Sequence, residues 1–359
     1  MPPLLEASEL TVELPTAEGW VRPVNEVSLA IYPGECLGLV GESGSGKTLL
    51  SLALMGLLPV GARTSGHAWL SGVPAALPKE IPPQPEESQH ARKDLCGASE
   101  QELRALRGRE LAMIFQEPMT SLNPVMRVGA QVAEAIRAHY RRMPERQVRR
   151  WVEEALRLAA VPEPSERARQ FPHQLSGGLR QRVMIAMAIA AGVADPGRET
   201  TREEGQRPSL ALRGPRLLIA DEPTTALDVT VQKEILELLE RLRRELGLGL
   251  LFITHDLGVV AQVADRVVVM YAGRVVEQGP AEEVLEAPRH PYTQGLLAAT
   301  PRLERGKPTP IPGSVPQLRA LPPGCAFEPR CGLRRSECGR GVPELRRVSP
   351  QHAARCVLV

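Results

Sequence analysis

The pattern of apolar and polar positions along the chain predicts a mixed α/β protein. Leu10–Leu14 and Val24–Ile31 alternate apolar and polar side chains, as half-buried strands of an antiparallel sheet do. Short uninterrupted apolar runs indicate strands that are buried on both faces. These runs are Cys36–Val40, Met113–Phe115, Leu217–Ala220 and Leu250–Thr254. Two longer segments, Leu49–Leu58 and Val183–Ala191, are predicted to be helices.

Other stretches mark turns and loops. Arg266–Tyr271 and Arg274–Gln278 flank Ala272 and Gly273 and predict a hairpin. Pro78–Lys93 and Ala194–Pro215 are rich in proline or charge and lack apolar periodicity, so we expect mobile surface loops there.

A glycine-rich segment joins the predicted strand Cys36–Val40 to the predicted helix that follows. It reads Gly41-Glu42-Ser43-Gly44-Ser45-Gly46-Lys47-Thr48 and fits the phosphate-binding pattern G-x-x-x-x-G-K-[ST]. Its glycines allow backbone N–H groups to point inward, and the positive end of the helix dipole favours bound phosphate. We expect Lys47 to reach the β- and γ-phosphates and the Thr48 hydroxyl to bind Mg²⁺.

Four polar residues lie at the ends of three predicted strands, and each is of a type that nucleotide hydrolysis needs. The amide of Gln116 could contact Mg²⁺ and the attacking water. Asp221 would hold Mg²⁺ and Glu222 would polarise the water. His255 could hydrogen-bond the γ-phosphate or orient Glu222. Taken singly, these residues have ordinary explanations as a loop amide, a solvated turn and a structural imidazole.

A further element precedes the predicted helix Val183–Ala191. Ser176 is a good N-cap residue, and Gly177 and Gly178 would let backbone N–H groups approach an anion closely. A plain helix cap is the ordinary alternative. The order of all these elements along the chain is more informative than any one of them.

In this order the elements resemble the nucleotide-binding subunit of an ATP-binding-cassette (ABC) transporter. The matching motifs are Walker A at Gly41–Thr48, the Q-loop at Gln116, the signature at Leu175–Gly178, Walker B ending at Asp221, the D-loop at Ala226–Asp228 and the switch histidine His255. The resemblance implies a P-loop NTPase cassette with a RecA-like core, an antiparallel β subdomain and a helical subdomain. It also implies a head-to-tail pair in which Ser176–Gly178 of one subunit seals the ATP of the other, with Asp228 beside the nucleotide.

Composition limits the partners. The 359 residues carry a net charge of only +2, which gives no electrostatic reason to expect nucleic-acid binding. The longest apolar stretches, Leu49–Val60 and Val183–Ala194, are shorter than the roughly 20 residues that span a bilayer. Met1–Glu6 does not resemble the start of a secretory signal. We therefore expect a peripheral subunit at the cytoplasmic face of the cell membrane.

The segments after the hairpin resemble the C-terminal region of oligopeptide, dipeptide and nickel importer ATPases. They are His290–Thr293, Leu296–Pro301 and Ile311–Gly313. We therefore divide the chain into a cassette at 1–280, with a helical subdomain at about 117–192, and a C-terminal region at 281–359.

Two cassette segments, Met119–Pro124 and Arg180–Met187, resemble the D-type member of the two non-identical ATPases in such importers. This resemblance implies an F-type paralogue as the partner ATPase. It also implies two permease subunits, one with a coupling helix that docks at Glu117–Val128, and an extracytoplasmic solute-binding protein that acts indirectly.

Four of the six cysteines lie near the end of the sequence, at Cys325, Cys331, Cys338 and Cys356. Disulfides are not expected in a reducing cytoplasm, and the spacings lack the C-x2-C pairs typical of structural zinc. Gly324-Cys325 and Arg330-Cys331 resemble a pattern linked to a 4Fe-4S cluster in peptide-importer ATPases. We expect such a cluster, with zinc or no metal as alternatives, and a nucleotide site in a separate domain.

These observations favour an ATPase that energises inward transport of di- or oligopeptides. An importer of nickel or another small solute is the alternative within the family. A chromosome-maintenance ATPase would need hundreds of heptad residues between its motifs, and a translation-associated ABC protein would carry two cassettes; neither feature is visible.

Overall fold

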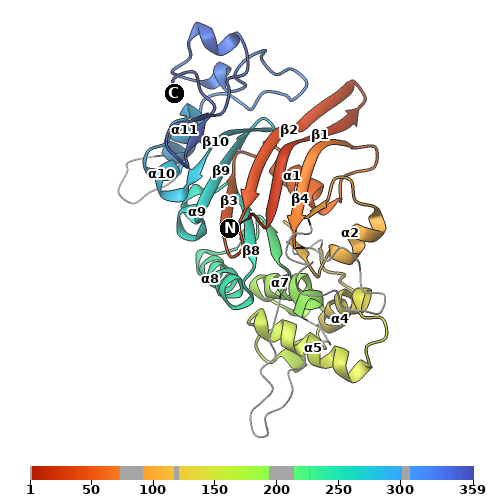
Figure 1. Ribbon diagram of the computed structural model, residues 1–359. Coiled ribbons are helices and arrows are strands. Elements are labelled where there is room, and N and C mark those ends of the chain that lie inside the picture. The colour runs from red at the N-terminus through yellow and green to blue at the C-terminus, as the bar shows by residue number, and fades with distance from the viewer. Residues whose placement is uncertain (1, 73–91, 117–120, 194–213, 226, 301–307) are drawn as a thin grey trace. The chain divides into compact units, whose positions relative to one another are not determined.

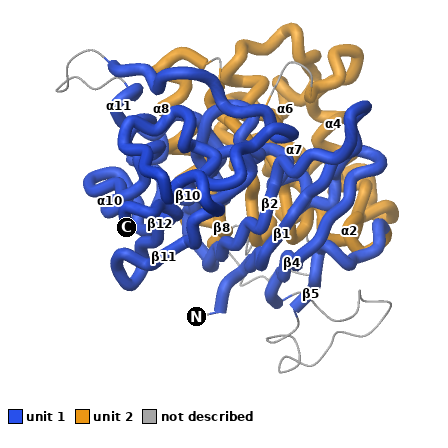
Figure 2. The backbone as a smooth tube through the Cα atoms, turned by 90° about the horizontal axis from the view of Figure 1, so that it is seen from above, with its two compact units in different colours: residues 1–100, 251–359 blue, residues 101–250 orange. Residues whose placement is uncertain are grey.

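The computed structural model describes residues 2–72, 92–116, 121–193, 214–225, 227–300 and 308–359. The chain divides into two compact units, one of residues 1–100 and 251–359 and the other of residues 101–250 (Figure 2). Most of the predicted loops at 78–93 and 194–215 lies outside the described residues, although Arg92 and Lys93 belong to a short strand. Within the described ranges, no helix is both long and apolar enough to cross a membrane.

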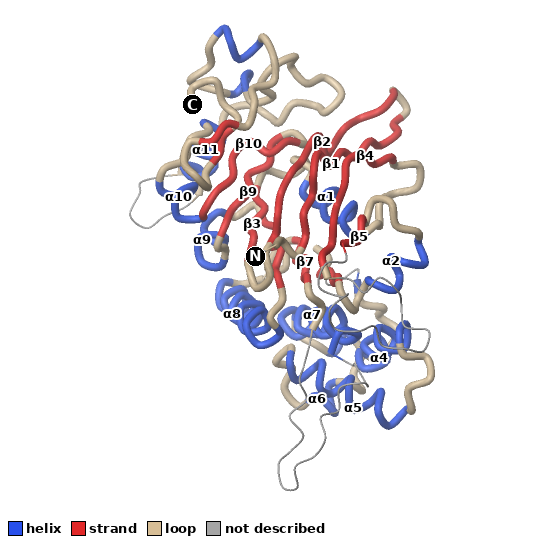
Figure 3. The backbone as a smooth tube through the Cα atoms, in the orientation of Figure 1, coloured by secondary structure: helices blue, strands red, loops and turns tan. Residues whose placement is uncertain are grey.

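The first unit contains a four-stranded antiparallel sheet, and it confirms the alternation predicted for the start of the chain. The strands lie in the order β2-β1-β4-β5, and Figure 3 shows β1, β2 and β4 side by side. Apolar side chains at alternate positions are fully buried, among them Leu10, Val12 and Val27. The strand bounds are β1 Leu5–Thr16, β2 Gly19–Ile31, β4 Arg63–Ser71 and β5 Arg92–Asp94.

The same unit contains a second set of strands, in the order β11-β12-β10-β9-β3-β8, of which Figure 1 labels β10, β9, β3 and β8. β3 pairs parallel with β9, and β9 and β10 form the predicted hairpin. Because β3 is buried along its whole length, its sequence is a continuous apolar run. The strand bounds are β3 Cys36–Val40, β8 Gly249–Thr254, β9 Arg266–Tyr271, β10 Arg274–Pro280, β11 Arg346–Arg347 and β12 Ala353–Ala354.

Short helices complete the first unit. Their bounds are α1 Lys47–Met55, α9 Leu257–Val263, α10 Ala281–Glu286 and α11 Pro291–Ala299, with 3-10 turns at Glu328–Arg330 and Ser336–Gly339. α1 begins inside the glycine-rich segment and ends at Gly56, whose left-handed conformation at φ 63° stops the helix. The predicted helix Leu49–Leu58 is thus confirmed, although it starts and ends earlier.

The segment after α10 returns to the sheet through a buried polar group. β12 pairs with β10, and the fully buried carboxylate of Glu277 accepts hydrogen bonds from the backbone N–H groups of Arg289 (2.6 Å) and His290 (3.0 Å). Its Oε1 also lies 2.8 Å from Nε2 of His352. A buried carboxylate needs such partners, so Glu277 joins three parts of the chain at one point.

The second unit contains one parallel strand pair and most of the helices. β6 (Leu111–Ile114) pairs with β7 (Leu217–Asp221), and α7 (Gly177–Val193) packs against α4 and α5. The remaining helices are α2 Glu100–Leu106, α4 Val128–His139, α5 Glu145–Leu158, α6 Pro164–Arg167 and α8 Val229–Leu246, with a 3-10 turn at Pro172–Gln174. The predicted strand at Leu217–Ala220 and the predicted helix at Val183–Ala191 are confirmed.

Candidate active site

The glycine-rich loop between β3 and α1 closes around the side chain of Lys47. The buried Nζ atom donates to the carbonyl oxygens of Gly41 (2.8 Å) and Glu42 (3.1 Å). Two glycines are required sterically, since a Cβ atom would lie 2.3 Å from the Met270 oxygen at Gly41 and 2.0 Å from the Pro23 oxygen at Gly46. The loop is therefore already shaped as a cradle with a cation inside it.

The rest of the predicted loop residues lie where an anion could reach them. Ser43, Gly44 and Thr48 are exposed, and Thr48 is in the first turn of α1. The Ser45 side chain is buried and lies 3.4 Å from Lys47 Nζ. The loop thus exposes two residues with hydroxyl groups, Ser43 and Thr48, around a fixed ammonium group.

In the second unit, Glu222 directly follows β7 and is held by two donors. Gln116 Nε2 donates to its Oε2 at 3.2 Å, and Thr225 Oγ1 donates to the same atom at 2.9 Å. Glu222 has a left-handed backbone at φ 47°, which is unfavourable for a residue with a side chain. The structure therefore brings together two residues that the sequence singled out, Gln116 and Glu222, and adds Thr225, which the sequence analysis missed.

Asp221 is the last residue of β7 and is almost completely buried, at 1% exposure. Its burial follows from its place at the end of a strand that is buried along its whole length. The neighbouring positions 221 and 222 thus place two carboxylates at the carboxyl end of one strand, as the sequence predicted.

The signature segment lies at the start of α7. Ser176 Oγ accepts the backbone N–H of Leu179 at 3.3 Å, so the predicted N-cap is confirmed. A Cβ atom on Gly178 would lie 2.8 Å from Cγ1 of Val231, which shows that this glycine permits close packing of α7 on α8. Gly177 has no such contact, because its Cβ atom would come no closer than 3.9 Å to Leu227.

Asp228 and His255 have different surroundings. Asp228 caps α8 by accepting the N–H groups of Thr230 (3.1 Å) and Val231 (3.0 Å). Ala226 of the predicted D-loop and residues 117–120 next to Gln116 lie outside the described residues.

His255 is exposed just after β8, and the next residue, Asp256, caps α9. His255 belongs to the first unit with the Lys47 loop, whereas Gln116, Asp221 and Glu222 belong to the second.

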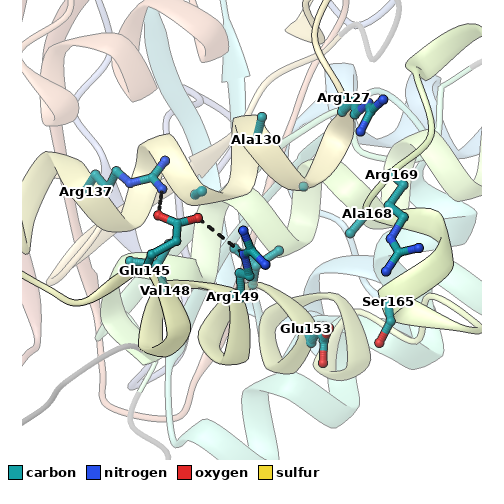
Figure 4. A pocket seen from close by; sticks show the side chains of 13 residues that line it. Arg127, Ala130, Arg137, Glu145, Val148, Arg149, Glu153, Ser165, Ala168 and Arg169 are labelled. Carbon is teal, nitrogen blue, oxygen red and sulfur yellow. Dashed lines mark hydrogen bonds and ion pairs between the residues drawn. The ribbon is translucent and has the colours of Figure 1, made fainter.

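The second unit also has a charged cavity of about 510 Å³, which the sequence analysis did not predict (Figure 4). It is formed by α4, α5 and the α6 region and is lined by Arg127, Arg137, Arg149, Arg169, Glu145 and Glu153 among others. Glu145 pairs with Arg137 and, at 3.5 Å, with Arg149. The motif residues described above do not line this cavity.

The C-terminal cysteines correct one sequence expectation. All four line a cavity of only about 10 Å³, which is about the size of one water molecule, and all four are free thiols. Burial raises the pKa of Cys325 to about 11 and also raises the pKa values of Cys331 and Cys356. Among the residues that the structure describes, no group of three or more His, Cys, Asp or Glu side chains could hold a metal. The predicted iron–sulfur cluster is therefore wrong, and the zinc alternative has no support either.

Ring packing and polar contacts, in place of a metal, hold the C-terminal region in its fold. Phe327 packs against Tyr271 and Tyr292 with ring centroids 5.3 Å away in each case, and the two tyrosine rings are 4.5 Å apart. The region also contacts the Lys47 loop, since the N–H of Glu42 donates to the Tyr292 hydroxyl and the Glu42 carboxylate pairs with Arg330. Sequence patterns gave no sign of these contacts, because the residues that make them are far apart along the chain.

Comparison with known proteins agrees with these motifs. The ABC transporter family matches residues 24–193, and the family "Oligopeptide/dipeptide transporter, C-terminal region" matches residues 276–338. The chain is 44% identical to a putative peptide import ATP-binding protein of Brucella ovis, over 99% of this chain and 97% of that protein. It is 41% identical to the dipeptide transport ATP-binding protein DppD of Bacillus subtilis, over 100% of this chain and 95% of that protein.

Solved structures show the same fold. The dimeric ATP-binding cassette MJ0796, bound to ADP and phosphate, superimposes with a TM-score of 0.59 and 24% identity. The match covers 77% of this chain and 98% of the MJ0796 chain. The fold is thus that of an ABC cassette with an added C-terminal domain, as the sequence predicted. A family of this kind implies ATP as the nucleotide, a dimeric ATPase and membrane permease partners. From its motifs, its fold and its relatives, the chain belongs to the ABC transporter ATPases of the oligopeptide/dipeptide importer family.

Proposed function

We propose that this chain hydrolyses ATP to drive the import of di- or oligopeptides across the cell membrane. The main support is the Gly41–Thr48 loop, which is closed around a buried lysine and lies next to β3 and α1. The names of the relatives, peptide import and dipeptide transport ATP-binding proteins, support the solute class. The subunit would act at the cytoplasmic face of the membrane.

The loop would bind the triphosphate of ATP. Lys47 Nζ is positioned by two backbone carbonyls and would exchange one or both for phosphate oxygens, while exposed backbone N–H groups hold the rest of the charge. The Thr48 hydroxyl, the Asp221 carboxylate and the amide oxygen of Gln116 would each supply a hard oxygen donor of the kind that Mg²⁺ prefers. Bound Mg²⁺ would offset the charge of the β- and γ-phosphates.

Glu222 would act as the general base toward the attacking water. Gln116 and Thr225 both donate to its Oε2 atom and hold the carboxylate in place, and the carboxylate would accept the proton of the water. With its Nε2 turned to Glu222, Gln116 keeps its amide oxygen for the ion. His255, exposed at the end of β8, would hydrogen-bond the γ-phosphate or orient Glu222.

Each site would need a second ATPase subunit. We propose that Ser176, Gly177 and Gly178 bind the ATP held by the partner's loop, with Asp228 close to the nucleotide. The exposure of Ser176 and Gly177 at the start of α7 supports this role. The partner would be an F-type paralogue, and two permease subunits would complete the importer, with an extracytoplasmic solute-binding protein delivering the peptide.

The proposed division of the chain follows the same reasoning. Residues 1–280 would form the ABC nucleotide-binding domain, with its helical subdomain at about 117–192, and residues 281–359 would form the C-terminal region. The two family matches, at 24–193 and 276–338, support this division.

Transport in vesicles tests the solute class. The chain, its partner ATPase and the permease subunits are reconstituted together, and uptake of labelled di- and oligopeptides and of nickel is measured with and without ATP. We expect ATP-dependent peptide uptake and peptide-stimulated hydrolysis. Uptake of nickel alone would replace the peptide proposal with the alternative, and the absence of ATP hydrolysis by the assembled complex would refute the function itself.

A further inference from the structure

The C-terminal region contacts the phosphate-binding loop at one residue, Glu42. The Tyr292 hydroxyl accepts the backbone N–H of Glu42 at 2.8 Å. Arg330 donates from Nη1 to Oε2 of Glu42 at 2.7 Å and from Nη2 to Oε1 at 3.1 Å. Together with the bond from Lys47 to the Glu42 carbonyl, these contacts fix the N–H, the C=O and the side chain of one loop residue.

The Arg330 guanidinium is built into this position. Its side chain is only 4% exposed, its Nε donates to the Pro312 carbonyl at 2.9 Å, and its Nη1 also lies 3.3 Å from the Tyr271 hydroxyl. The bidentate fork fixes the direction of the Glu42 carboxylate as well as its charge. A residue with all three nitrogens engaged and little exposure is well suited to hold a loop in one conformation.

The charge of Glu42 gives this contact a chemical consequence. Glu42 is the second residue of a loop whose purpose is to bind a polyanion, so an unpaired carboxylate there would repel the nucleotide. Arg330 neutralises that carboxylate, and its guanidinium lies beside the rings of Tyr271 and Phe327. Lys47 is then the charged side chain of the loop that faces the phosphates of the nucleotide.

We propose that Arg330 is a positioning residue of the ATP site, which holds Glu42 so that the loop keeps its affinity for the triphosphate. This proposal rests on the proposed ATP-binding function of the loop. It makes the C-terminal region part of the nucleotide site of the same chain. Arg330 acts through Glu42 and has no contact of its own with the reacting atoms.

A double-mutant cycle on the full chain tests the proposal, with binding of Mg·ATP measured by calorimetry. Arg330→Met keeps the length of the side chain but leaves Glu42 charged and unpaired, and we expect affinity to fall roughly tenfold or more. In the Glu42→Gln background the same Arg330→Met change should cost under about threefold, because no charge is left to repel the nucleotide. Arg330→Lys should restore part of the loss, since it keeps the charge without the fork.

Further measurements separate positioning from general destabilisation. In the assembled transporter, Arg330→Met should raise the KM for ATP and change kcat less than about threefold, since Glu222 is untouched. Arg334→Met is the matched control, because Arg334 lies in the same region but is exposed. Its ion pair with Glu328 is long, at 3.8 Å. We expect this control to bind ATP normally.

Two results would overturn the proposal. One is unchanged ATP affinity in Arg330→Met, and the other is an equal loss in the wild-type and Glu42→Gln backgrounds, which would indicate a fold defect. Lys47→Ala distinguishes a failure of the underlying function: if Lys47→Ala also binds ATP normally, the loop is not the ATP site at all. If Lys47→Ala abolishes binding while Arg330→Met has no effect, only the inference about Arg330 fails.

Discussion

The strands that lead into the phosphate-binding loop and the region after α10 are held together in different ways. β3 and β9 are buried apolar strands in parallel register, and their stability comes from the burial of side chains such as Leu39 and Val268. The C-terminal region depends on a few buried polar groups, chiefly Glu277 and Arg330, each with several partners. Apolar packing between strands tolerates small shifts of side chains. The buried polar groups lose several hydrogen bonds at once when one residue is substituted.

The residues that act on the attacking water and the C-terminal region should also differ in what a mutation costs. A change at a group that acts on the attacking water should reduce turnover by orders of magnitude and leave the fold intact. A change in the C-terminal region should reduce stability or ATP affinity by a smaller factor. The following predictions test this contrast, from the largest effect to the smallest.

The first prediction concerns hydrolysis. Glu222→Gln removes the proposed general base but keeps a side chain that can still bond to Gln116 and Thr225, so turnover should fall by roughly 10² to 10⁴ while ATP still binds. Steady-state phosphate release by the assembled transporter and ATP binding by the isolated chain measure the two effects. Near-normal turnover would remove Glu222 from its proposed role.

The second prediction concerns Glu277, the buried carboxylate of β10 that binds the C-terminal region. Glu277→Gln exchanges one acceptor oxygen for an NH2 group that faces donors, so the free energy of unfolding should fall by about 1 to 3 kcal/mol. Chemical denaturation measures this loss, with Glu282→Gln, an exposed residue of α10, as the control. Equal stability of the two variants would show that Glu277 is not a point on which the region depends.

The third prediction concerns the second contact with Glu42. Tyr292→Phe removes the hydroxyl that accepts the Glu42 N–H, and a lost neutral hydrogen bond costs about 1 kcal/mol, so ATP affinity should fall about fivefold. The phenyl ring preserves the packing against Phe327. Calorimetric ATP titration compares this variant with wild type, and a loss as large as that of Arg330→Met would contradict the dominant role given to the charge pair.

The smallest effect is expected at the cysteines. Cys331→Ser exchanges one small half-buried side chain for another, so the free energy of unfolding should change by less than about 1 kcal/mol and ATP binding should stay normal. Denaturation and ATP titration of the purified variant measure both. A large loss of stability would mean that the thiol makes a contact that the aromatic cluster and the buried polar groups do not replace.

The sequence was sufficient for the parts of the molecule that depend on local patterns. The sequence predicted the apolar run Cys36–Val40, the loop Gly41–Thr48 and the two carboxylates at the end of β7, because strand burial, backbone freedom and residue type leave a signature in neighbouring positions. The N-cap at Ser176 was identified for the same reason.

The parts that were missed depend on contacts between distant residues. Arg330 and Glu42 are 288 positions apart, and Glu277 and His352 are 75 apart, so no periodicity connects them. The grouping of four cysteines suggested a metal cluster, whereas the region is held by ring packing and buried hydrogen bonds. Thr225 lies beside the Walker B carboxylates, yet its bond to Glu222 requires the left-handed turn there, which the sequence alone does not reveal.

The pairing of Glu42 with Arg330 also affects how the protein is made. A ribosome adds roughly 5 to 20 residues per second, so the glycine-rich loop is synthesised about 15 to 60 seconds before the arginine that completes it. Throughout that interval the nascent loop has an unpaired carboxylate. Nascent chains that still lack residue 330 should therefore bind ATP more weakly than finished chains. Nucleotide binding should then be delayed until the polypeptide is nearly complete.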